Sequence, residues 1–193
     1  MFNFAVINQF IDMKTRFLVL FAFVMSVCGL GAAQTYRGMA DVSFAIGSFV
    51  EDGEVSHDPL IYTSISTTHG VQVNINHFLG LGIECSPWSK LTYDGEDGGL
   101  KKAVPVYVMW RMDFFNRKCS PFFDVRPGYQ VGGPGGFYAG INGGLRITLG
   151  KRSGFNVSLG FELRRITLID EYDESYELNT NALTGILRFG FDF

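Results

Sequence analysis

The sequence predicts an all-β protein, an eight-stranded antiparallel up-and-down transmembrane β-barrel. Three observations lead to this prediction. The 193-residue chain combines 24 glycines with 19 phenylalanines, two residue types of weak helix propensity, and only 18% of its residues are charged. Beyond residue 34, apolar and polar side chains alternate with a period of two, which indicates strands. The connections between these stretches are alternately short and long, as in barrels that span a membrane.

The first 33 residues predict an export signal. Lys14 and Arg16 precede the uncharged apolar run 17–27, and small residues follow up to Ala33. This order of basic, apolar and small residues is that of a secretory signal peptide. The run is shorter than the ~20 residues that a membrane-spanning helix needs. We therefore expect cleavage after Ala33 and a barrel domain over residues 34–193.

Two alternatives stay open for this end of the chain. Met13 is a second methionine from which a signal of ordinary length would begin, so translation could start there. Cys28 could be lipid-modified and become the N-terminus of a lipoprotein, although Val27 before it is larger than the residue usually found there.

The first four strands are predicted at 37–49, 60–74, 78–86 and 103–115. In each, bulky apolar side chains alternate with glycine, serine or charged residues. The second strand alternates least regularly, and we expect a bulge near His69 and Gly70. The clear apolar positions are Val42, Phe44, Ile46, Leu79, Leu81, Ile83, Val104, Val106, Val108, Trp110, Met112 and Phe114.

The last four strands, at 121–130, 137–149, 155–164 and 183–193, alternate most clearly. About 9–11 tilted residues suffice to cross a bilayer, so all eight strands are long enough. The apolar face here carries Phe123, Val125, Tyr129, Phe137, Ala139, Ile141, Leu145, Ile147, Leu149, Phe155, Val157, Leu159, Phe161, Leu163, Leu183, Gly185, Leu187, Phe189, Phe191 and Phe193.

The connections predict the topology. Short turns are expected at 74–77, 116–120 and 150–154, and longer loops at 50–59, 87–102 and 168–179, whereas the glycine-rich connection 131–136 is of intermediate length. An even number of strands places both chain ends in the periplasm and the long loops outside. Cys85 and Cys119 then lie at opposite ends of the barrel. We expect two free thiols, because a disulfide requires Cα atoms within ~7 Å.

Charged residues predict which face of the strands is enclosed. The apolar face carries no acidic residue, and Arg165 alone among the basic residues interrupts it, where its side chain could snorkel. An eight-stranded barrel has a narrow interior that side chains fill, and buried charges must pair there. We therefore expect a plugged lumen with an ion-pair network, which could alternatively rearrange as a gate. The predicted lumen residues are Asp41, Glu84, Arg111, Asp113, Asp124, Arg126, Arg146, Glu162, Arg164, Arg188 and Asp192.

The long loops hold most of the remaining acidic residues. The densest group, in loop 168–179, consists of Asp170, Glu171, Asp173 and Glu174. Its oxygens could bind a divalent cation, but the spacing is not that of a calcium-binding EF-hand loop, so a solvated surface is the other interpretation. The three histidines lack the spacing of a metal site. We predict no cofactor and no resident metal.

Two stretches of the sequence resemble a known family. The C-terminal residues 187–193 end in alternating aromatics, Phe189, Phe191 and Phe193, and resemble the signal that the barrel assembly machinery reads. The stretch 121–129 is similar to the fifth strand of the outer membrane β-barrel family of Bacteroidota. The whole domain resembles small barrels of the OmpA transmembrane-domain and OmpX type. The resemblance implies an outer-membrane protein that is delivered by periplasmic chaperones, surrounded by lipid and monomeric.

These expectations together predict a structural or surface-interaction protein and not an enzyme. Loops 50–59, 87–102 and 168–179 would contact a surface ligand that the sequence does not identify. The alternatives are a small-solute, porin-like channel, a lipid A-modifying barrel enzyme that uses Thr67 and His69, and a soluble lipocalin-like barrel. The net charge of −3 argues against a nucleic-acid partner.

Overall fold

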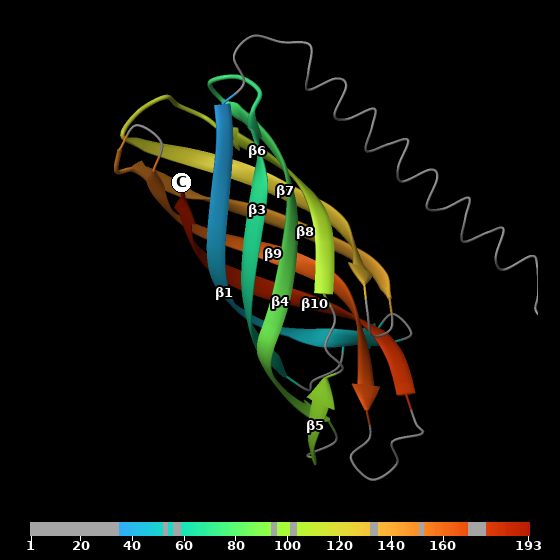
Figure 1. Ribbon diagram of the computed structural model, residues 1–193. Coiled ribbons are helices and arrows are strands. Elements are labelled where there is room, and N and C mark those ends of the chain that lie inside the picture. Colours follow the sequence, from blue (N-terminus) through green and yellow to red (C-terminus); the bar gives the residue numbers. More distant parts are fainter. Residues whose placement is uncertain are drawn as a thin grey trace, which may run out of the picture. The chain divides into compact units, whose positions relative to one another are not determined.

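The computed structural model describes residues 35–51, 54–55, 59–93, 96–100, 104–131, 135–150, 153–169 and 177–193. They form one antiparallel sheet that closes into a barrel (Figure 1). Eight long strands build its wall, which confirms the predicted fold class. They are β1 (Thr35–Glu51), β3 (Leu60–Gln72), β4 (His77–Tyr93), β6 (Val104–Asp113), β7 (Cys119–Val131), β8 (Gly136–Thr148), β9 (Gly154–Ile169) and β10 (Glu177–Asp192). The predicted export signal lies outside the described residues.

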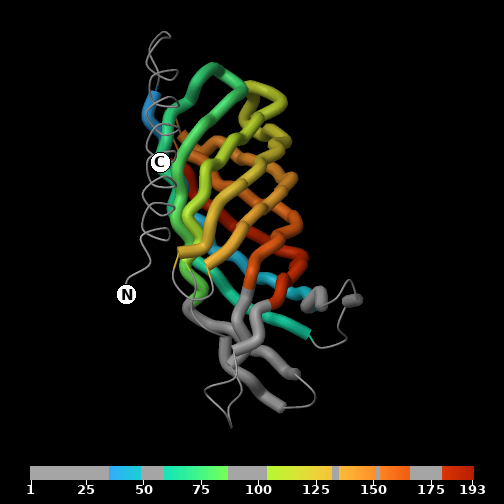
Figure 2. Tube along the Cα trace, turned by 90° about the vertical axis from the view of Figure 1, so that its right-hand side faces the viewer, coloured from blue at the N-terminus to red at the C-terminus, as the bar shows by residue number. Residues whose placement is uncertain are grey.

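Each long strand pairs with the next along the chain, and the last strand closes the barrel on the first. The β1–β10 register runs from Met39 opposite Asp192 to Val50 opposite Asn181. Two backbone hydrogen bonds between Gly38 and Phe193, of 2.8 and 2.9 Å, continue this seam beyond the end of β10. The strands run obliquely around the wall (Figure 2). No unpaired edge is therefore left along the described wall.

The two ends of the barrel differ in their connections. We call the end with the short β3–β4, β6–β7 and β8–β9 connections the turn end, and the opposite end the loop end. The C-terminus lies at the turn end, and β5 lies at the loop end (Figure 1). Two short strands extend the sheet at the loop end: β2 (Glu54–Val55) pairs with β1, and β5 (Glu96–Leu100) pairs with both β4 and β9. The alternation of short and long connections follows the predicted topology.

Several predicted boundaries are wrong at the loop end. Residues 87–102 are not a single loop, because β4 continues to Tyr93 and pairs with β5. The last strand begins at Glu177 and not at residue 183. The bulge lies between Thr63 and Ile65, not at residues 69–70. It lies opposite Pro87, whose missing N–H explains why the ladder shifts at this point.

The strand alternation separates a buried inner face from an exposed outer face. Along β3, buried and more exposed residues alternate from Leu60 to His69. Among the described residues, buried polar and charged side chains outnumber buried apolar ones. The most exposed include Leu159 and Phe161, each with 67% of its surface accessible. The molecule is thus polar inside and apolar outside, the reverse of a water-soluble domain.

The inner face also contains large apolar and aromatic side chains. Met39, Phe78, Tyr107, Met109 and Tyr138 form a buried cluster. Inward glycines make room for such bulk. A Cβ added to Gly144 or Gly160 would come within 2.2 Å of a backbone oxygen of the neighbouring strand. These two glycines permit the close strand approach that a narrow, filled barrel requires.

The described residues include no helix that is long and apolar enough to span a membrane.

Cys85 and Cys119 are both free thiols, as predicted, and both are exposed.

Candidate functional site: the charged lumen

The structure places all the predicted lumen residues on the inner face. Each is buried except Arg146, whose side chain is 18% exposed. One lumen arginine was missed in the sequence, because Arg37 is the first residue of the predicted first strand. Arg37 lies two residues before Met39 and four before Asp41, so strand alternation places all three side chains on the same face, and this spacing could have revealed it. With Arg37, six arginines and six carboxylates face each other among the described inner-face residues, so the formal charges of these residues cancel.

The layer nearest the loop end is a closed ring of four ion-paired side chains. Arg164 lies 2.6 Å from Glu84, and Arg188 lies 3.1 Å from both Glu84 and Glu162. An Arg164–Glu162 pair closes the ring. The hydroxyls of two buried residues, Tyr62 and Tyr138, donate hydrogen bonds to Glu162 and Glu84 respectively. The ring therefore has both its charges and many of its hydrogen bonds satisfied.

This ring crosses the lumen. Glu84 lies on β4, whereas Glu162 and Arg164 lie on β9. In the order of the eight long strands, β4 and β9 are four strands apart in both directions, on opposite walls. The ion pairs therefore bridge the full width of the barrel.

A second layer lies in the middle of the lumen. Arg126 on β7 pairs with Asp124 at 3.0 Å and with Asp41 on β1 at 3.2 Å. Strands β1 and β7 also lie on opposite walls. The Tyr107 hydroxyl lies 3.4 Å from Arg126 and 3.0 Å from the hydroxyl of Thr68. This layer also joins opposite walls by an arginine.

The third layer lies near the turn end. Asp192 accepts hydrogen bonds from Arg37 at 2.5 Å and from Arg146 at 2.6 Å. Asp113 accepts hydrogen bonds from Arg37 at 3.2 Å and from Arg111 at 3.1 Å. Asn156 links Arg111 to Asp192. The Arg111 guanidinium lies 3.5 Å from the ring centre of Phe122. Phe122 lies two residues before Asp124 on β7, so both side chains face inward. The adjacent Phe123 faces outward.

The outer wall is apolar between its two ends. Arg165 is the only charged side chain on the outer face of the strands among those that the structure describes. Exposed aromatic residues lie towards both ends, with Tyr129 and Phe137 near the loop end and Phe114 and Phe193 near the turn end. A closed antiparallel barrel with a charged interior and an apolar outer band flanked by aromatics is an outer-membrane-type β-barrel. The fold and the lumen together define this class.

No model of a known protein family matches the chain, and no curated protein matches its sequence. Among solved structures, the chain is similar to the crystal structure of Neisserial surface protein A, with a TM-score of 0.57 and 13% identity over 83% of this chain and 97% of that one. The chain is also similar to OprG of Pseudomonas aeruginosa, with a TM-score of 0.48 and 12% identity over 83% of this chain and 97% of that one. For Ail of Yersinia pestis, the TM-score is 0.44 and the identity 12%, over 82% of this chain and 99% of that one. The similarity to Neisserial surface protein A supports the fold of a small outer-membrane barrel. The resemblance to the OmpA, OmpX and Bacteroidota families stays a prediction.

Thr67 and His69, the pair considered for a lipid-modifying enzyme, are in contact on the outer wall. The Thr67 hydroxyl lies 3.0 Å from Nε2 of His69, and the Tyr36 hydroxyl lies 2.6 Å from Nδ1. The single hydroxyl hydrogen of Thr67 is donated to the carbonyl of Met39 at 3.2 Å. Thr67 can then only accept a hydrogen bond from His69, so this arrangement does not provide the base that a nucleophile needs.

The remaining predicted sites are the acidic cluster of loop 168–179 and the C-terminal aromatic residues. Asp170, Glu171, Asp173 and Glu174 lie outside the described residues. No group of three or more potential metal ligands occurs in the described part of the chain. The residues of the predicted assembly signal, Phe189, Phe191 and Phe193, face outward at the turn end.

Proposed function

We propose that this protein is an outer-membrane barrel with a plugged lumen that acts as a structural or surface-interaction protein. The single observation that carries the proposal is the ion-pair ring of Glu84, Glu162, Arg164 and Arg188, which joins opposite walls. A water-filled pore needs a wider barrel, of the order of 16–18 strands. The function then belongs to the surfaces of the barrel and not to its interior.

The proposed orientation places the loop end outside the cell and the turn end in the periplasm. Short periplasmic turns and longer outer loops are the rule for such barrels. The acidic loops would contact a surface ligand of unknown identity. Phe189, Phe191 and Phe193 would engage the barrel assembly machinery after periplasmic chaperones deliver the chain. The inserted protein would be a monomer surrounded by outer-membrane lipid.

Planar-bilayer recordings test the plugged lumen. We expect the purified protein to give no large, steady conductance, because ion pairs fill the lumen in three layers and two of these layers join opposite walls. A change in gel mobility between unheated and boiled samples of the same preparation verifies folding, and co-flotation with lipid vesicles verifies insertion. Large and stable open-channel currents from inserted protein would contradict the plugged lumen and support the small-solute channel.

A further inference from the structure

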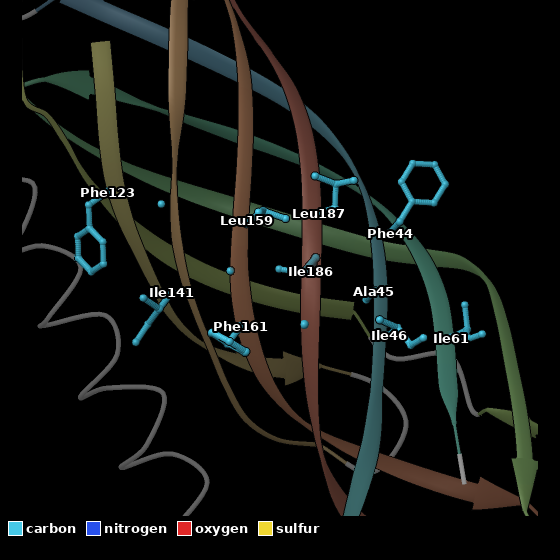
Figure 3. Close-up of a pocket in the computed structure, with 13 residues that line it drawn as sticks. Phe44, Ala45, Ile46, Ile61, Phe123, Ile141, Leu159, Phe161, Ile186 and Leu187 are labelled. Atoms are coloured by element: carbon cyan, nitrogen blue, oxygen red, sulfur yellow. The ribbon is translucent and has the colours of Figure 1, made fainter. Parts of the chain in front are cut away.

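A groove of about 810 Å³ crosses the outer wall from Phe123 on β7, over β8, β9, β10 and β1, to Ile61 on β3 (Figure 3). Two rows of cross-strand partners form its floor and sides. One row contains Gly143, Leu159, Leu187 and Phe44, and the other contains Ile141, Phe161, Gly185 and Ile46. Its lining consists of glycine, alanine, aliphatic and phenylalanine residues. The groove therefore offers only apolar contacts and lies within the apolar outer wall.

Two outward glycines create the groove. A Cβ added to Gly143 would be 4.0 Å from its nearest neighbour, and one added to Gly185 would be 3.7 Å from its nearest neighbour. Both distances are ordinary van der Waals contacts. The inward Gly144 and Gly160, by contrast, have no space for a Cβ. Strand packing thus does not require glycine at 143 and 185, and the missing side chains leave the hollow between large neighbours.

Arg165 lies above the groove on the same strand as Phe161. It faces outward four residues nearer the loop end, ~13 Å along the strand at the usual rise per residue. Its aliphatic stem packs over Gly136 of β8, where a Cβ would be only 2.7 Å from the Cβ and Cδ of Arg165. Among the described residues, the guanidinium has no ion-pair partner. A cation without an ion-pair partner in the described part of the chain therefore lies on the loop-end side of an apolar groove.

We propose that the groove and Arg165 form a binding site for a phosphorylated glycolipid of the outer leaflet. One acyl chain occupies the groove, and Arg165 binds the phosphate, to which a guanidinium can donate two hydrogen bonds. The site rests on the proposed function, since that orientation places Arg165 in the outer leaflet. A second copy of the chain fits less well, because an apolar protein interface would leave Arg165 desolvated without a counter-charge.

Native mass spectrometry of the folded protein tests this site. The probe is diphosphorylated lipid A, with phosphatidylethanolamine as the competing lipid. We expect the unaltered protein to retain lipid A preferentially. Filling the groove with the double substitution Gly143→Leu and Gly185→Leu should reduce retention about tenfold, because the acyl chain loses its van der Waals contacts. Ala40→Leu, an exposed position on β1 outside the groove, should leave retention unchanged.

Arg165→Gln tests the headgroup contact with a change that does not touch the core. We expect the barrel to fold, to keep binding acyl chains and to lose its preference for diphosphorylated over dephosphorylated lipid A. Equal retention of both lipids by the unaltered protein and every variant would overturn the proposal. Heat-dependent gel mobility separates the two possible failures. A shifted band without lipid preference contradicts the site alone, and an unshifted band contradicts the membrane barrel.

Discussion

Replacing Glu84 with alanine is expected to destabilise the folded barrel by about 3–5 kcal/mol, the usual cost of removing one partner of a buried ion pair. Glu84 is completely buried and lies within 3.1 Å of both Arg164 and Arg188. Its removal leaves one carboxylate, Glu162, for two guanidinium groups inside the barrel. The free energy of unfolding, measured by urea titration of protein refolded into vesicles, gives the effect directly.

Two variants control for this experiment. Glu84→Gln keeps the size of the side chain and removes only its charge, so it separates electrostatics from packing. Ile83→Ala changes the neighbouring residue, which faces outward and is 47% exposed, and should cost no more than about 1 kcal/mol. If Glu84→Ala costs no more than Ile83→Ala, water solvates the arginines and the lumen is not plugged.

Arginine in place of Leu159 is expected to destabilise the inserted barrel by about 2–4 kcal/mol, the cost of a cation near the bilayer midplane. Leu159 faces outward in the middle of the wall and borders Gly143 and Leu187. Among the described residues, a guanidinium at this depth has no carboxylate on the outer face to pair with. Urea unfolding in vesicles measures the change, with the gel mobility of unheated samples as a second readout.

Leu149→Arg is the matched control. Leu149 follows β8 at the turn end, where the same substitution should cost only about 0–1 kcal/mol. The two leucines are almost equally exposed, at 67% and 63%. If water surrounded the barrel, both substitutions would be nearly neutral. Equal effects at the two positions would therefore contradict a lipid-facing outer wall.

The alternation of side chains between the two faces of a strand made the inner and outer faces of the barrel predictable from sequence. Each strand residue points to the side opposite its neighbours, so Asp124 and Arg126 could be assigned to the lumen together. Arg37 escaped because alternation is not visible at the first residue of a strand. Phe122 escaped because its neighbour Phe123 is equally apolar. The alternation was therefore informative within the strands and weakest at their ends.

The partners across the lumen were not predictable in the same way. The register between neighbouring strands decides which arginine lies close to Glu84 across the lumen. The period-two pattern of a single strand carries no information about this register. Pro87 likewise suggested a loop, whereas β4 accommodates it next to a bulge. The groove was missed because Gly185 was counted simply as a member of the apolar face. A glycine among large outward residues is a signal that could have revealed it.

Membrane fractionation combined with heat-dependent gel migration tests the central claim most directly. The claim is that the chain forms a closed barrel whose apolar outer wall contacts lipid. The account predicts that the protein stays in the outer-membrane fraction after a high-salt wash, and that unheated samples migrate differently from boiled ones. Protein recovered in the soluble fraction with identical migration before and after boiling would contradict it.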